Sequence, residues 1–262
     1  MLRLFRLTGV FFQLNVHEIF MYRASFITGI ISVILWMALS LVSISILTYQ
    51  SPYVGGWSKY ELYLVQGFYS LLLGVMYFSF RANFREMSRY IRLGDLDFIL
   101  LKPCDSQFLV SVGRFILYQF SRILLGLFLI IFALHILRIK PTILQLILLI
   151  PLLFSSLTII YSLWFFISTL TIWFVDLFNL DELFLQLTGV TRYPLEVFKY
   201  ISEFLLYITL PLVVVTSVPA QLLLNKLNLS LAVWSIILSS SLFFMTRKFW
   251  YFALKYYTSA SS

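Results

Sequence analysis

Two carboxylates stand two residues apart in the most charged part of this chain. Asp95 and Asp97 belong to the string Gly94-Asp-Leu-Asp97, inside the polar stretch Arg81–Arg114. Paired carboxylates can serve as general acid and base, but an aspartyl protease of the membrane needs acids that face one another from within spans. Both acids lie in a loop between apolar runs and are flanked by bases. This pair therefore does not predict catalysis.

The other chemistry-bearing residues form no recognisable catalytic or metal site. His17 and His135 are far apart, and the single cysteine, Cys104, has no histidine near it, so a zinc site is not expected. The phosphate-loop pattern Gly-x-x-x-x-Gly-Lys-Ser/Thr and the serine-hydrolase pattern Gly-x-Ser-x-Gly are both missing. We expect no catalytic residue and no cofactor in this chain.

The elements that position these residues are expected to be membrane-spanning helices. Of the 262 residues, 61% are hydrophobic and only 11% are charged, which excludes an ordinary soluble domain. A span needs roughly 20 apolar residues. We predict an all-α polytopic membrane protein, with an amphipathic interfacial helix at 1–25, one transmembrane domain at 26–250 and a cytoplasmic tail at 251–262. The six predicted spans are 26–48, 61–80, 115–137, 151–175, 200–224 and 229–245.

The distribution of bases predicts the orientation. The long apolar segment Thr142–Val175 could cross once or twice, and one crossing places fourteen bases on the side of the termini and four on the other. Two crossings give ten against eight, so the positive-inside rule favours six spans with both termini in the cytoplasm. Residues 142–150 then either lie along the outer interface before Pro151 or form part of a tilted fourth span. Residues 176–199 are expected as a cytoplasmic loop.

The net charge of +8 does not indicate nucleic-acid binding. The bases lie mainly at the ends of apolar runs, where anionic lipid headgroups explain them. Membrane lipids, and no nucleic acid, are therefore the expected contacts of these bases.

Polar and helix-breaking residues inside the spans are candidates for function. Arg122 in the third span and Glu203 in the fifth are predicted to form an intramembrane ion pair; alternatively, Arg122 extends its long side chain to the interface. Pro211 and Pro219 interrupt the fifth span, which indicates either a re-entrant segment near the outer surface or a kinked helix.

The loop between the second and third spans favours a short helix that another protein holds. Gly94 permits a turn, Asp95 can cap a helix and Pro103 prevents its continuation. Alternating acidic and apolar side chains can enter a groove of a partner. The alternative is a solvated loop that only sets topology.

At this loop the chain resembles the permease subunits of type-2 ABC exporters, most closely a six-span bacterial family. The resemblance begins with Ile91-Arg-Leu-Gly-Asp-Leu-Asp-Phe-Ile-Leu-Leu-Lys-Pro103. It continues with Arg192-Tyr-Pro194, Val197-Phe198, Pro211 and Val218-Pro-Ala220, and so covers essentially the whole chain.

The resemblance implies a permease that carries no ATPase motif and pairs with a separate nucleotide-binding subunit, which binds ATP and magnesium. It implies a coupling helix in the loop, an elbow helix at 1–25, a re-entrant outer segment in the fifth run, and a dimer with itself or a related permease. It implies export across the bacterial plasma (inner) membrane. The implied contacts with the ATPase subunit are Gly94, Asp95, Leu96, Asp97, Lys102 and Pro103.

Two other classes of protein fit this sequence less well. An ion-coupled secondary transporter would show paired repeats and acids near the midplane. A membrane-embedded lipid-modifying enzyme would need clustered polar residues at one membrane face. The sequence shows neither pattern.

Overall fold

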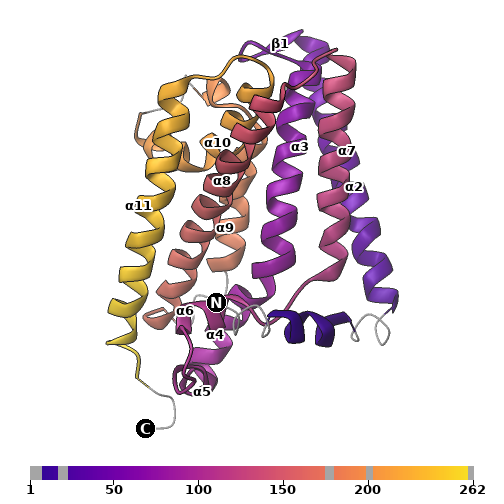
Figure 1. Cartoon of the computed structure of the whole chain (residues 1–262). Helices are drawn as coiled ribbons and strands as arrows, with labels where there is room; N and C mark the ends of the chain where they lie inside the picture. The colour runs from indigo at the N-terminus through magenta and orange to yellow at the C-terminus, as the bar shows by residue number, and fades with distance from the viewer. Residues whose placement is uncertain (1–7, 17–22, 175–179, 199–202, 259–262) are drawn as a thin grey trace.

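Helices dominate the chain and run side by side as one bundle (Figure 1). The computed structural model describes residues 8–16, 23–174, 180–198 and 203–258. Within this part, five helical stretches are long and apolar enough to cross a membrane, and Pro211–Leu223, in the predicted fifth span, is a shorter apolar helix. An all-α multi-pass architecture is confirmed, and the number of six spans stays a prediction. The five stretches are Arg23–Gln50, Lys59–Leu93, Leu117–Ile136, Ile143–Ile172 and Leu229–Leu254.

The chain order places a small hairpin at one end of the bundle and short helices at the other (Figure 1). The first half contains α2 (Arg23–Gln50), the antiparallel pair β1 (Tyr53–Val54) and β2 (Trp57–Ser58), α3 (Lys59–Met76), the π-helical turn η1 (Tyr77–Arg81), α4 (Ala82–Leu93), α5 (Asp95–Leu100), α6 (Ser106–Ser111), η2 (Leu117–Gln119) and α7 (Phe120–Ile136). The second half contains α8 (Ile143–Thr169), η3 (Leu170–Ile172), α9 (Leu180–Thr188), η4 (Gly189–Arg192), η5 (Leu195–Phe198), α10 (Glu203–Leu223) and α11 (Leu229–Leu254). We name the two ends the hairpin end and the α5 end.

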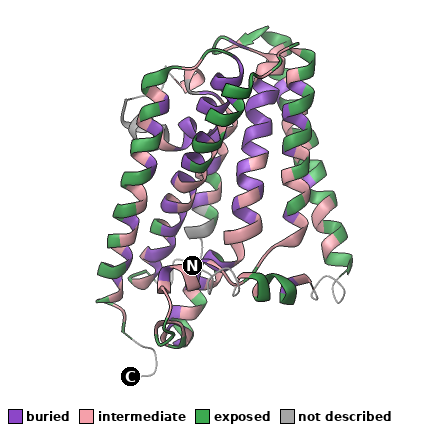
Figure 2. Cartoon of the chain, in the orientation of Figure 1, coloured by how far each residue is buried: buried purple, intermediate pink, exposed green. Residues whose placement is uncertain are grey.

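The core is centred on α3, which belongs to the most buried of the five spanning-length stretches (Figure 2). Glycines allow α7 to approach it closely. A Cβ added to Gly126 would lie 2.6 Å from the backbone nitrogen of Leu71 and 2.9 Å from the carbonyl oxygen of Gly67. Small residues at such a contact let two membrane helices pack backbone against backbone.

Residues Ile143–Ile172 form one long helical stretch. α8 begins at Ile143 because Thr142 and Gln145 form a capping box. Pro151 lies inside the helix, which agrees with the alternative that residues 142–150 are part of a tilted fourth span. A single helix in this segment agrees with the one-crossing alternative, and its extra length can be accommodated by tilt.

Residues 180–198, which precede α10, run from the α5 end toward the hairpin end. This course differs from the cytoplasmic loop that the sequence predicts at 176–199. Phe184 of α9 stacks on Trp164 with ring centroids 5.0 Å apart, in the half of α8 nearer the α5 end. Twelve residues later, Glu196 accepts a hydrogen bond of 2.9 Å from the Trp57 indole in the hairpin. Residues 180–198 therefore pass through the bundle, and Arg192 lies within it. From the sequence, the charge of Arg192 favours a position in a loop outside the membrane.

α10 is assigned as one helix that contains both Pro211 and Pro219. A proline at 219 cannot donate to the carbonyl of Val215 one turn earlier. The Ser156 hydroxyl of α8 donates to that carbonyl instead, at 2.8 Å. Glu196 lies at the hairpin end through its contact with Trp57. Leu222 lies at the same end, because Gln145 at the start of α8 donates to the Leu222 carbonyl at 3.0 Å. A re-entrant segment in a membrane stays a prediction.

The amphipathic helix predicted at 1–25 is helical over residues 8–16, and 1–7 and 17–22 lie outside the described residues. It lies across the bundle at the α5 end, drawn in indigo in Figure 1. Asn15 anchors it, donating to the Gly113 carbonyl at 3.3 Å and accepting from the Phe115 N–H at 3.2 Å.

Candidate functional site: the α4–α6 unit

The predicted coupling loop folds into three short helices at the α5 end. Gly94 ends α4 and begins α5 with a φ of +76°, a left-handed conformation that glycine adopts without strain. Asp95 and Asp97 fall in the first turn of α5, where carboxylates interact favourably with the helix dipole. Gly94, and not Asp95, is therefore the N-cap. α5 ends at Leu100, three residues before Pro103.

α5 has a buried side and an exposed side. Leu96 is 0% exposed and belongs to the same hydrophobic cluster as Met87 and Ile91 of α4. Phe98, one helical half-turn further on, is 69% exposed. Leu96 therefore holds α5 against the protein, and the opposite side is free for a partner.

The exposed side contains apolar residues that sequence reasoning did not select. Leu93, Phe98 and Leu101 are all large and exposed. Of the predicted contacts, Lys102 and Pro103 are also exposed, Asp95 and Asp97 are half-buried, and Gly94 is buried with Leu96. An exposed apolar group next to charged residues at a water-facing end is typical of a protein contact. Alternation of apolar residues in the sequence cannot tell Leu96 from Phe98, because the packing of α5 on α4 decides which one is buried.

The unit is fixed to the last membrane helix through Asp105. This residue caps α6 by accepting from the Phe108 N–H at 3.0 Å. Its other oxygen accepts from Arg247 of α11 at 2.6 Å and from the Tyr251 hydroxyl at 3.2 Å. Trp250 of α11 donates to the Ser106 hydroxyl at 3.0 Å. The loop is therefore a structured part of the bundle.

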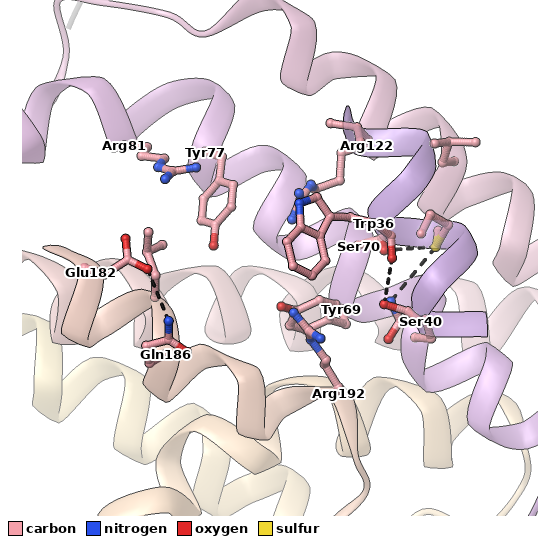
Figure 3. A pocket seen from close by; sticks show the side chains of 15 residues that line it. Trp36, Ser40, Tyr69, Ser70, Tyr77, Arg81, Arg122, Glu182, Gln186 and Arg192 are labelled. Atoms are coloured by element: carbon pink, nitrogen blue, oxygen red, sulfur yellow. Dashed lines mark hydrogen bonds between the residues drawn. The ribbon is translucent and has the colours of Figure 1, made fainter. Parts of the chain in front are cut away.

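The predicted pair of Arg122 and Glu203 cannot be assigned from the structure, because the Glu203 side chain lies outside the part that is described. Arg122 stacks its guanidinium over the Tyr77 ring at 5.0 Å. Arg81 approaches the same ring at 4.8 Å (Figure 3). Arg122 therefore lies in a pocket inside the bundle, together with residues from other elements that sequence spacing does not connect.

These features define a class of membrane protein. Several apolar helices of spanning length make it a multi-pass membrane protein. Within the described residues there is no group of three or more His, Cys, Asp or Glu side chains that could hold a metal ion. A structured loop with an exposed apolar side is its most distinctive surface.

Comparison with known families agrees with this class. Residues 34–261 match the model of a family described as ABC-2 family transporter protein, so the chain belongs to that family. It is a membrane transporter permease, as the resemblance indicated. No curated protein and no solved structure matches the chain.

Proposed function

We propose that this chain is the membrane permease of an ATP-driven exporter and that a separate ATPase subunit docks on the exposed side of α5. The observation that carries the docking proposal is the side formed by Leu93, Phe98 and Leu101. A helix with protruding apolar side chains can enter a hydrophobic groove, while Asp95, Asp97 and Lys102 meet charges at its rim.

The surroundings of α5 suit the transmission of force. α5 follows α4 directly, and α4 continues α3 through η1 as one helical stretch, Lys59–Leu93. The Asp105–Arg247 contact joins the same unit to α11. A push on α5 therefore acts on two membrane helices at once, and ATP-driven closure of two docked subunits would change the packing between two permeases of a dimer.

Charge supports a cytoplasmic α5 end. Six bases lie between Arg81 and Arg114, and Arg247, Lys248 and Lys255 lie at the same end. The hairpin end carries Lys59, Arg138, Lys140 and Lys226. Bases are retained preferentially on the cytoplasmic side. We therefore place both termini in the cytoplasm of a bacterium and the hairpin end outside its inner membrane.

Co-purification tests the docking proposal. The tagged chain is co-expressed with the ATPase genes that neighbour its own gene and is isolated in mild detergent. We expect the wild type to retain an ATPase subunit and Phe98→Asp to lose most of it, because a charge at the centre of an apolar contact is left desolvated.

Tyr53→Asp is the matched control, since Tyr53 is a 65% exposed aromatic residue in the hairpin at the opposite end. It should leave retention unchanged. Equal retention by wild type and Phe98→Asp would refute α5 as the docking element, and a wild-type chain that retains no ATPase would favour an ion-coupled transporter.

A further inference from the structure

A cationic pocket lies inside the bundle (Figure 3). Its volume is about 240 Å³, and its wall is built from α2, α3, η1, α7, α9 and η4. It extends from Arg81, at the α5 end of η1, to Ser40, near the middle of α2. A second cavity of about 100 Å³ shares Trp36, Ser40, Gln66 and Arg192 with it and continues toward Ile44.

Positive charge exceeds negative charge in this pocket. Three guanidinium groups line it, those of Arg81, Arg122 and Arg192, against one carboxylate, that of Glu182. Glu182 accepts a hydrogen bond from Gln186 at 3.2 Å. Among the described residues, none of the three arginines has a carboxylate within ion-pair distance. Charged side chains inside a membrane helix bundle are costly, and such residues mark ligand sites.

The arginines are held by aromatic rings and keep hydrogen-bonding capacity. Arg81 and Arg122 share the Tyr77 ring, and Arg192 lies 5.2 Å from the Tyr69 ring. The Nε atoms of Arg122 and Arg192 are buried and have no hydrogen-bond partner in the described part of the chain. Gln66 Oε1 is likewise unpartnered there. Two guanidinium groups against one ring repel each other, and an anion between them would relieve this repulsion.

The surroundings of the pocket also indicate an apolar part of the ligand. α2 forms one wall, and Trp36, which lines the pocket, is 59% exposed. The neighbouring apolar side of α2 includes Leu35 at 57% and Val42 at 54% exposed, where lipid chains can contact a membrane helix. A hydrocarbon chain can therefore lie against α2 in the membrane while an anionic group reaches the arginines.

We propose that this pocket binds the anionic head, a phosphate or carboxylate, of an amphiphile whose hydrocarbon chain stays against α2. Guanidinium groups suit both anions, because their fork of N–H donors matches two anionic oxygens. That the pocket belongs to the path of the cargo rests on the proposed transport function; the binding itself does not.

Titration of the purified full-length chain in nanodiscs of neutral phosphatidylcholine tests this inference. Dodecyl phosphate is the probe, and tryptophan fluorescence is the readout because Trp36 lines the pocket. We expect saturable binding of dodecyl phosphate, none of dodecanol, and binding of inorganic phosphate at least about tenfold weaker, since it lacks the buried chain. If inorganic phosphate bound as tightly as dodecyl phosphate, the site would be one for a free anion, and the proposal of an amphiphilic ligand would be refuted. If dodecanol bound as tightly, the proposal of an anionic head group would be refuted.

Arg122→Gln and Arg192→Gln should each weaken dodecyl phosphate binding by about tenfold or more, through loss of a charged hydrogen-bond donor. Arg85→Gln is the matched control, because Arg85 is exposed on α4 one turn beyond Arg81 and outside the pocket. Ser40→Phe fills the pocket without removing a charge and should also weaken binding. If Arg122→Gln, Arg192→Gln and Ser40→Phe all bound dodecyl phosphate with wild-type affinity, the site would be refuted. Three variants are used so that the test remains decisive if one of them folds poorly.

The titration contains neither ATP nor an ATPase subunit, so its result is independent of docking. If the chain binds dodecyl phosphate but never retains an ATPase, the pocket is supported and the proposed function is refuted. If it retains an ATPase but binds no amphiphile, the proposed function is supported and the pocket is refuted.

Discussion

Asp105 shows how a single carboxylate can hold a loop against a membrane helix. Partial burial on its own raises the pKa of Asp105, but hydrogen bonds from the Phe108 N–H and Arg247 outweigh it and leave the pKa below its usual value. Folding therefore favours the charged form of Asp105, and this adds to the free energy of unfolding. The added stability is fully present above the pKa that Asp105 has in the unfolded chain, and it is lost as pH falls through the lower pKa of the folded protein.

Asp105→Asn should lower the thermal midpoint of the purified permease, because it removes a charge-assisted contact worth about 1–3 kcal/mol. The difference from wild type should stay constant from pH 7 to pH 5. It should shrink below pH of about 4, where the wild-type carboxylate also takes up a proton. A difference that does not change with pH would contradict the role of the charge. Asp95→Asn provides the control, because Asp95 belongs to the same loop and no ion pair joins it to another described residue.

Among the elements, α10 depends on a neighbouring helix for one backbone contact. The Ser156 hydroxyl takes the place of the N–H that Pro219 lacks. Ser155, next to it and equally buried, donates to Leu152 of its own helix at 2.9 Å. The two serines therefore differ in role although they are adjacent in sequence.

Ser156→Ala should destabilise the protein by about 1–3 kcal/mol, because it leaves the Val215 carbonyl buried and unpaired. Ser155→Ala should cost clearly less, since that carbonyl can keep its bond within the helix. Adding Pro219→Ala should rescue Ser156→Ala, because alanine restores an N–H one turn from Val215. Detergent melts followed by circular dichroism measure all three; equal effects of the two serine variants would contradict this account.

The contact between α3 and α7 permits no side chain at its centre. Gly126→Ala should destabilise the bundle by about 1–3 kcal/mol, because the new methyl would meet backbone atoms of Leu71 and Gly67. Gly9→Ala is the control, since nothing lies within 4 Å of a Cβ there. It should be neutral or slightly stabilising by helix propensity. A melt of Gly126→Ala that matches wild type would show that the helices can move apart freely.

At the scale of the molecule, apolar runs predicted most of the helices and could not predict how the chain passes between them. The predicted spans 26–48 and 229–245 fall within α2 and α11. Residues 142–150 could be interfacial or part of a tilted fourth span, because a proline can end a helix or lie inside one; in the structure Pro151 lies inside a helix that Thr142 caps. The contact of Arg192 with the Tyr69 ring could not be predicted from the sequence of the loop 176–199, because it forms only in the tertiary structure.

The course of residues 180–198 can be tested by cross-linking. In the double variant Gly55→Cys, Val197→Cys we expect an internal disulfide on mild oxidation, because a Cβ at position 55 would lie 3.0 Å from the Cγ2 atom of Val197. The φ of +62° at position 55 strains a cysteine there, so we expect the disulfide to form in part of the molecules. Val197→Cys by itself leaves Cys104 at the α5 end and should form no internal disulfide. A bond between Cys104 and position 197 would instead support the cytoplasmic loop. Mobility of the protein on a non-reducing gel distinguishes the products.

The unbroken stretch Lys59–Leu93 has a mechanical consequence. Its 35 residues correspond to about 50 Å of helix, which exceeds the roughly 30 Å of a hydrocarbon core. The same rod carries the hairpin at one tip and α5 at the other, with Tyr77 and Arg81 between them. A tilt imposed at α5 is therefore transmitted along α4 and α3 toward the hairpin, and it moves Tyr77 and Arg81 with it. The π-helical turn η1, in which these two residues lie, is the place where the stretch can bend and take up part of the tilt.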